Sequence, residues 1–222
     1  FPDQNMKPLK LHYVTMTDYD PNYKDVHVMY AKQKITQSLG EHIANHQLKQ
    51  IRIAETEKYQ HVTFFFNGGE EKTFNGEERI LAPSPKVATY DVQPEMSAYE
   101  LRDKIIAAIN ESTPDFICLN FANTDMVGHT GIFEAAVKSA ETVDQCLSEI
   151  IPVALEKDYY IIIIADHGNA DIMKNPDGSP HTAHTTNPVP IFVLSPNKEI
   201  SKVKDGKLAD IAPTILHIMG LD

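Results

Sequence analysis

An α/β protein with a mostly parallel sheet is predicted by two patterns in this chain of 222 residues. First, strand-like and helical segments alternate from residue 97 to residue 219, which is typical of α/β domains. Second, Asp and His side chains directly follow two of the predicted strands, and open α/β sheets bind ligands at that edge. An apolar fraction of 42% and a charged fraction of 23% suit a soluble globular domain.

The first half of the chain predicts few regular elements. Ile35, Leu39, Ile43 and Ala44 recur at helical spacing, which predicts a helix within residues 33–46. Alternating apolar and polar residues, together with residue types that favour strands, predict strands at residues 9–16, 50–55 and 61–67. Polar, charged and proline-rich composition predicts irregular surface segments at residues 17–25 and 70–95.

The second half shows a clearer order of elements. Ser97 followed by Glu100 has the pattern of a capping box, so a helix is expected to begin there and run to about residue 110. The continuous aliphatic run at residues 161–164 is typical of a central parallel strand buried on both faces. The other expected elements are strands at residues 116–121, 159–165 and 190–194, and helices at residues 131–157 and 209–219.

Charge and cysteine content narrow the range of partners. The formal net charge of −11 disfavours a nucleic-acid backbone as partner, because such binders concentrate positive charge. No apolar stretch approaches the roughly 18 residues of a membrane span.

Cys118 and Cys146 fall in apolar contexts and are expected to be inert buried thiols, so a reducing, cytoplasmic location is expected. The chain starts at Phe1 and stops just after a helix, which suggests a piece of a longer protein.

Asp166 and His167 directly follow the aliphatic run, so a rigid strand would deliver a carboxylate and an imidazole to the sheet edge. Gly168 allows a tight turn immediately afterwards. Both side chains could then converge on one ion. The alternative is an Asp that caps a helix beside a surface His.

Asp125 and His129 are four residues apart, so on a helix both would face the same way and could bind a single cation. The alternative is a polar loop between a strand and a helix. His184 lies in a loop rich in Thr that ends at Pro188, where a single histidine is often only a surface residue. His181, three residues earlier, is a weaker ligand candidate.

Taken together, these side chains form a mixed oxygen and nitrogen ligand set at one edge of the predicted sheet. Asp125, His129 and His184 would make one three-residue site, and Asp166 with His167 would be half of a second. Carboxylate plus imidazole suits Mn, Zn or Fe, whereas purely oxygen sets suit Mg or Ca. Two neighbouring ions can hold the attacking and leaving oxygens of a phosphoryl displacement.

These motifs carry a resemblance that covers nearly the whole chain and is weakest over the first 30 or so residues. The chain resembles the C-terminal part of the cofactor-independent (2,3-bisphosphoglycerate-independent) phosphoglycerate mutases of the alkaline phosphatase superfamily. The metal motifs alone would indicate only the superfamily. The stretches that indicate the mutases are Glu-Thr-Glu-Lys-Tyr (residues 55–59) and Ser-Pro-Lys-Val-Ala-Thr-Tyr-Asp (residues 84–91).

The resemblance implies an alkaline-phosphatase-like three-layer sandwich that is incomplete at its N-terminus. Residues 1–32 would be the end of the substrate-holding (phosphotransferase) domain plus a hinge, and residues 33–222 the C-terminal part of the metal-binding phosphatase domain. The implied reaction interconverts 3-phosphoglycerate and 2-phosphoglycerate in a monomeric enzyme through a phosphoserine, without 2,3-bisphosphoglycerate. The implied cofactors are two divalent metal ions, with Mn the first choice and Zn, Co or Mg the alternatives.

The resemblance also assigns roles to single residues. Asp125, His129 and His184 would hold the first metal, Asp166 and His167 would contribute to the second, and Lys58 would bind the phosphoryl group of the substrate. In the family, an N-terminal Asp and the nucleophilic serine complete the second site. Neither Ser112 nor Ser179 lies in the nucleophile's motif, so this chain alone is expected to be inactive.

Two alternatives to a mutase remain. One is another enzyme of the superfamily, such as a phosphopentomutase or a phosphomonoesterase. The other is a folded module without catalytic activity.

Overall fold

The computed structural model describes residue 7 and residues 9–20, 22–31, 35–200 and 202–221. The chain divides into two units, residues 1–36 and residues 37–222, which are described separately below. The domain boundary predicted at residues 32 and 33 lies outside the described residues. The helix predicted within residues 33–46 is shorter than expected: residues 35–38 are not helical, and α1 spans Leu39–Asn45.

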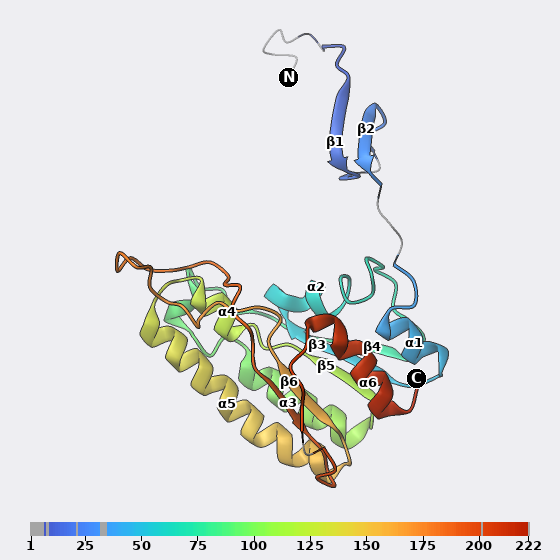
Figure 1. Cartoon of the computed structure of the whole chain (residues 1–222), viewed down its shortest axis with the longest axis vertical. Helices are drawn as coiled ribbons and strands as arrows, with labels where there is room; N and C mark the ends of the chain where they lie inside the picture. Colours follow the sequence, from blue (N-terminus) through green and yellow to red (C-terminus); the bar gives the residue numbers. More distant parts are fainter. Residues whose placement is uncertain (1–6, 8, 21, 32–34, 201, 222) are drawn as a thin grey trace. The chain divides into compact units, whose positions relative to one another are not determined.

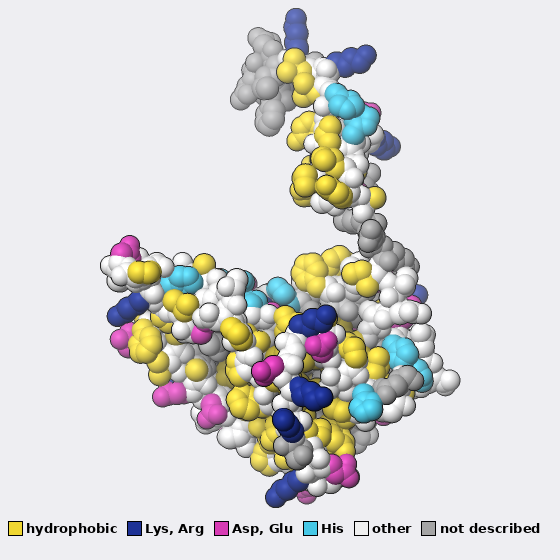
Figure 2. All heavy atoms as spheres, in the orientation of Figure 1, with side chains coloured by type: hydrophobic (Ala, Val, Ile, Leu, Met, Phe, Trp, Pro, Cys, Tyr) yellow, Lys and Arg dark blue, Asp and Glu magenta, His cyan; other side chains and the backbone are white. Residues whose placement is uncertain are grey.

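The first unit contains two parallel strands, β1 (Tyr13–Thr17) and β2 (Val26–Tyr30). The strand predicted at residues 9–16 therefore begins four residues later, and the sequence analysis missed β2. Hydrophobic side chains are exposed along both strands, as Figure 2 shows. Tyr13, Met16 and Met29 are each more than half exposed. Within the described residues of this unit, no second layer covers them.

The second unit is built on three parallel strands, with β3 (Gln50–Glu55) between β4 (Glu77–Ala82) and β5 (Phe116–Leu119) (Figure 1). All of β3 is buried, and its alternate side chains point to opposite faces of the sheet. Ile51 and Ile53 pack into the hydrophobic core.

Long helices cover the face of the sheet that carries Ile51 and Ile53. Helix α3 (Ala98–Glu111) packs against β3, β4 and α5 (Phe133–Glu156), and α4 (Asn123–Gly128) packs against α5 (Figure 1). The fully buried part of this core consists of side chains from these strands and helices, which are Ile51, Ile53, Ala82, Leu101, Ile105, Ala108, Ile109, Ile150 and Ala154.

The opposite face of β3 is polar and lies against α1 (Leu39–Asn45). The Gln50 side chain donates to the Gly40 carbonyl oxygen at 2.9 Å. The Arg52 guanidinium is fully buried and stacks over the Phe66 ring, 4.2 Å from its centroid. The sheet thus has α3 and α5 on one face, and α1 with the turns at residues 63–67 on the other. These three layers confirm the α/β class and the three-layer arrangement.

Strand β6 (Ile161–Ile164) is not the central parallel strand that its aliphatic run predicted. It pairs antiparallel with β7 (Ile191–Leu194), and the two strands form a separate two-stranded sheet. Its side chains are only partly buried, and Ile164 is 38% exposed. A continuous aliphatic run predicts burial on both faces, but within the described residues β6 has a strand partner on one edge only.

The strand predicted at residues 61–67 is also wrong. After β3 the chain forms a 3-10 turn, η2 (Thr56–Lys58), and a short helix, α2 (Tyr59–Val62). The residues that follow bond locally: the amide of Phe65 donates to Gln60, and that of Asn67 donates to Thr63. Because these amides bond within the turns, they are not available to pair with a neighbouring strand.

Two smaller expectations also need correction. Residues 70–95, predicted to be irregular, contain β4. Ser97 lies at the start of α3, but its hydroxyl donates to the Pro83 carbonyl oxygen at 2.7 Å, and Glu100 pairs with Lys104 rather than completing a capping box. The remaining elements are η3 (Tyr90–Val92), η4 (Leu208–Asp210) and α6 (Ile211–Met219).

Both cysteines are free: Cys146 is buried and Cys118 is partly buried. In the part of the chain that the structure describes, no helix combines the length and the apolar character needed to cross a membrane.

We predict that Ile53→Ala lowers the free energy of unfolding by about 2–5 kcal/mol, because it opens a cavity between β3 and α3. Urea unfolding measures the change. Val92→Ala is the control, since Val92 is 66% exposed and its truncation should cost less than about 0.5 kcal/mol. Equal losses in the two variants would contradict the position assigned to the core.

Candidate metal centre

Asp125 and His129 lie at the two ends of one short helical turn. Asp125 is in the first turn of α4, the helix that follows β5 after a short connection, and His129 is the C-cap residue of the same helix. The spacing of four residues brings both side chains to one face, and His129 Nε2 lies 3.1 Å from Asp125 Oδ1. Of the two alternatives left open for this motif, a helix or a loop, the structure has the helix.

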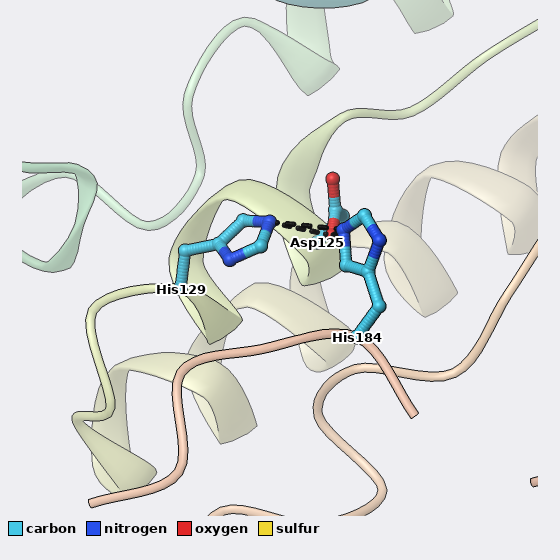
Figure 3. A group of neighbouring side chains, drawn as sticks. All are labelled: Asp125, His129 and His184. Carbon is cyan, nitrogen blue, oxygen red and sulfur yellow. Dashed lines mark hydrogen bonds and ion pairs between the residues drawn. The ribbon is translucent and has the colours of Figure 1, made fainter. Parts of the chain in front are cut away.

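His184 reaches the same point from a distant loop. Its Nε2 lies 3.1 Å from Asp125 Oδ1 and 3.1 Å from His129 Nε2. Figure 3 shows the two imidazoles approaching the carboxylate from different segments. The structure thus brings together the three residues that the sequence analysis grouped as the first site.

The size of this group fits a small metal ion. One nitrogen or oxygen atom from each residue lies within 4.8 Å of the others. Ligands that bind a metal at about 2.0–2.2 Å lie about 3–3.5 Å apart, which is close to the 3.1 Å separations here. Two imidazoles and one carboxylate are the donors that Zn and neighbouring divalent transition metals accept.

The Asp125 carboxylate is held by contacts on both of its oxygens. Lys58, which is 8% exposed, forms an ion pair with Oδ2, and the Asn169 side-chain amide donates to Oδ1 at 2.6 Å. Burial alone would raise the pKa of Asp125, but the bonds from Lys58 and Asn169 outweigh it and lower that pKa to about 2. The carboxylate is therefore ionised at neutral pH.

A backbone contact determines the tautomer of His129. Its Nδ1 lies 2.7 Å from the Thr182 carbonyl oxygen, which can only accept a hydrogen bond. Nδ1 must therefore carry the proton, and the neutral ring presents the lone pair of Nε2 toward Asp125 and His184. Metal-binding histidines are commonly oriented by such a bond to the second ring nitrogen.

Asp166 and His167 lie beside this group, yet they do not form a ligand cluster with it among the described residues. The His167 ring stacks on the His184 ring, with centroids 3.7 Å apart and an interplanar angle of 22°. His167 Nε2 lies 3.6 Å from Asp166 Oδ2, and the Asp166 side chain is 63% exposed. The pair has the donor types of a half-site, at the position expected after β6.

Asn169 was not singled out as a functional residue from the sequence. It is 5% exposed, and besides the Asp125 side chain it contacts the Asp125 carbonyl oxygen at 3.2 Å. A Cβ atom on Gly128 would lie 2.5 Å from Asn169 Oδ1, so only glycine leaves room for this amide. The available signal was its position two residues after His167, within the motif that carried the resemblance.

The weaker candidates lie elsewhere. Ser112 is the C-cap residue of α3, and the Ser179 hydroxyl donates to Asp177 at 2.6 Å. His181 is partly buried, and its backbone amide donates to the Met173 carbonyl oxygen at 3.0 Å. None of the three belongs to the ligand group formed by Asp125, His129 and His184.

A cleft with apolar walls opens beside the candidate metal centre. It has a volume of about 1050 Å³ and lies between β5 and β6, with Ile117, Leu119, Ile161 and Ile163 among its lining residues. Asp125, Asp166 and His167 also line it. Within the described residues, β5 is hydrogen-bonded only to β3 and β6 only to β7, so each strand has one unpaired edge.

Fold and site together define a metalloenzyme, and comparison with known proteins gives the same class. The family model described as the metalloenzyme superfamily matches residues 1–222, so the chain belongs to that superfamily. A protein of Flavobacterium johnsoniae named 2,3-bisphosphoglycerate-independent phosphoglycerate mutase is 60% identical over 221 residues, covering 100% of this chain. The Bacteroides thetaiotaomicron protein of the same name is 59% identical over 212 residues, covering 96% of this chain.

A solved structure agrees with these relatives. A phosphoglycerate mutase of Leishmania mexicana, studied at low cobalt concentration, is similar with a TM-score of 0.82 and 27% identity, covering 94% of this chain and 41% of that protein. The chain spans 43% of the length of the Flavobacterium johnsoniae relative and 42% of the Bacteroides thetaiotaomicron one. The resemblance inferred from the motifs is confirmed.

We predict that His184→Ala weakens Mn²⁺ binding by at least about tenfold. Loss of a residue that only orients a metal ligand already costs about that much affinity, and loss of the ligand itself should cost no less. Isothermal titration calorimetry measures the affinity. His46→Ala removes an exposed imidazole from the end of α1 and should leave binding unchanged. Equal affinities in the two variants would exclude His184 as a ligand.

Gly128→Ala should also weaken Mn²⁺ binding, by roughly tenfold, because the new methyl group displaces Asn169 from Asp125. Helix propensity alone would make this substitution stabilising by roughly 1 kcal/mol, so a loss of affinity cannot be attributed to a weaker helix. Asn169→Ala should cause the same loss, and the double variant should lose no more. Additive losses would show that Gly128 acts by another route.

Proposed function

We propose that this chain is the metal-binding portion of a 2,3-bisphosphoglycerate-independent phosphoglycerate mutase, an isomerase that interconverts 3-phosphoglycerate and 2-phosphoglycerate in glycolysis and gluconeogenesis. The observation that carries the proposal is the convergence of Asp125, His129 and His184 on one point, with 3.1 Å between their ligand atoms. The names of the relatives, at 59–60% identity over nearly the whole chain, support this substrate rather than another phosphate ester.

Asp125, His129 and His184 would hold one divalent ion, and Asp166 with His167 would supply two ligands of a second. Manganese is the first choice, and zinc, cobalt or magnesium could replace it. Bound ions at such sites supply positive charge that stabilises phosphoryl oxygens and lowers the pKa of a coordinated hydroxyl group. The cobalt named for the Leishmania mexicana protein supports a site that accepts divalent transition metals.

Lys58 and Asp125 define the local electrostatics of the reaction. Lys58 is nearly buried and keeps its ammonium beside the ionised Asp125 carboxylate, at the edge where β3 and β5 end. When a substrate phosphoryl group arrives, this ammonium is the nearby side-chain cation that can neutralise part of its charge. The ion pair also keeps Oδ1 of Asp125 turned toward the two imidazoles.

The cleft between β5 and β6 indicates how the second half-site is completed. Its walls are apolar, and Asp166 and His167 are among its lining residues. In the described part of the chain, each of the two flanking strands has one edge without a strand partner. This chain matches less than half of the length of each relative. We assign the occupant of the cleft as a segment that corresponds to the unmatched part. A strand there would bury the aliphatic walls and could carry a nucleophilic serine and a further carboxylate to the site.

The remaining parts of the proposal follow the family resemblance. Residues 1–32 would belong to the substrate-holding domain and its hinge, and residues 33–222 to the phosphatase domain. The protein would act as a monomer in the cytoplasm, without 2,3-bisphosphoglycerate and through a phosphoserine. Because neither Ser112 nor Ser179 belongs to the ligand group, the 222 residues alone would not transfer a phosphoryl group.

A chimera tests the proposal directly. The 221 residues matched in the Flavobacterium johnsoniae relative are replaced by this chain, and conversion of 3-phosphoglycerate to 2-phosphoglycerate is measured in the presence of Mn²⁺. We expect the chimera to be active and the isolated chain to be inactive. His184→Ala in the chimera should lower kcat/KM by at least about tenfold, and His46→Ala should leave it unchanged.

The contrary outcomes are distinct. Mutase activity in the isolated chain, purified free of host enzyme, would overturn its predicted inactivity. A chimera that hydrolyses nitrophenyl phosphate or isomerises ribose phosphate, but not phosphoglycerate, would favour another enzyme of the superfamily. A folded chimera without any activity would favour a module that is not catalytic in this chain.

A further inference from the structure

We propose that Asp171 is a positioning residue that holds His184 in the ligand group by binding the loop on which His184 lies. This inference rests on the metal site proposed above and assigns a role to a residue that is not itself a ligand. Asp171 lies outside the group formed by Asp125, His129 and His184. It acts through the next residues of the His184 loop.

Asp171 makes direct contacts with the loop. The Thr185 hydroxyl group lies 3.0 Å from Asp171 Oδ1 and 2.9 Å from Oδ2, so it can donate to either oxygen. The Asn187 side-chain amide donates to Oδ2 at 2.6 Å. Hydrogen bonds to an ionised carboxylate are roughly twice as strong as those between neutral groups. The carboxylate therefore holds the residues immediately after His184.

The backbone of the same two segments is joined at one further point. The amide of Thr185 donates to the Gly168 carbonyl oxygen at 2.8 Å, and these residues form an isolated antiparallel bridge. A Cβ atom on Gly168 would lie 2.2 Å from Thr185 Oγ1 and 2.7 Å from Asp171 Oδ1. Glycine is required here because the Thr185 hydroxyl fills that space in order to reach Asp171.

The segment that carries Asp171 also holds the other side of the site. Asn169, two residues earlier, donates to the Asp125 carboxylate, and the His167 ring stacks on His184. Residues 166–171 thus contact Asp125 through Asn169 and the His184 loop through His167 and Asp171. The His184 side chain is 47% exposed and comes from a loop without regular structure, so its place beside Asp125, His129 and His167 depends on how that loop is held.

The first test measures Mn²⁺ affinity by calorimetry in the 222-residue chain. Asp171→Ala should weaken binding by roughly 10–100-fold, the range for removal of an outer partner of a ligand. Asp177→Ala is the matched control, because it removes the same charge from an exposed aspartate whose bonds among the described residues go to Ser179 in its own turn. Binding should stay within about twofold. Circular dichroism and thermal unfolding check that each variant is folded.

A second pair of variants separates positioning from simple loss of charge. Thr185→Val removes the hydroxyl donor without changing the charge and should weaken binding, whereas Thr185→Ser keeps a donor and should restore affinity close to that of the unaltered chain. If Asp171 acts through Thr185, the double variant Asp171→Ala, Thr185→Val should bind within about twofold of Asp171→Ala alone. A loss equal to the product of the two single losses would overturn the proposal.

A readout without metal keeps this inference separate from the proposed function. The ring protons of His184 should show the shift expected from stacking on His167 in an NMR spectrum of the metal-free chain. Asp171→Ala should move these signals toward those of a free histidine, and Asp177→Ala should not. Unchanged signals in Asp171→Ala would overturn the positioning role. Absence of Mn²⁺ binding to the unaltered chain would instead overturn the proposed metal site.

Discussion

The candidate site depends on one buried interaction, the ion pair between Lys58 and the Asp125 carboxylate. It joins the turn after β3 to the helix after β5, and it keeps the carboxylate ionised despite partial burial. With Oδ2 occupied by Lys58 and Oδ1 contacted by Asn169, the carboxylate can face the two imidazoles in only one orientation. The Asp125 carboxylate, held in this way, can attract a cation at Oδ1. It also keeps the ammonium of Lys58 close to that position.

The parallel arrangement of β3, β4 and β5 explains why these groups meet. Parallel strands present their C-terminal ends at one edge, so the segments after β3 and β5 start close together even though 64 residues separate Glu55 from Leu119. The residues after β6 contribute Asn169 and Asp171, which connect Asp125 with the His184 loop. The candidate metal centre is therefore surrounded by a second layer of polar contacts that come mainly from one short segment.

Sequence patterns were reliable where local spacing and burial agreed. The spacing of Asp125 and His129 predicted a shared helical face, and the alternation of elements from residue 97 onward predicted the α/β class. Patterns failed where composition was ambiguous. Three phenylalanines at residues 64–66 favour a strand, but local turn bonds satisfy that backbone, and the aliphatic run of β6 was assigned to a parallel centre although it pairs antiparallel with β7.

The candidate ligand types, their spacing and the family can all be recognised from short motifs, because the chemistry requires particular side chains in them. Which of these candidates converge depends on the packing of the folded chain. In the folded chain His184 lies against Asp125 and His129, with Asp166 and His167 beside them. Asn169 bonds to Asp125, and Asp171 bonds to the loop that carries His184. The physical reason is that contacts between residues 44 or 55 positions apart depend on how strands and loops pack, which no local pattern encodes.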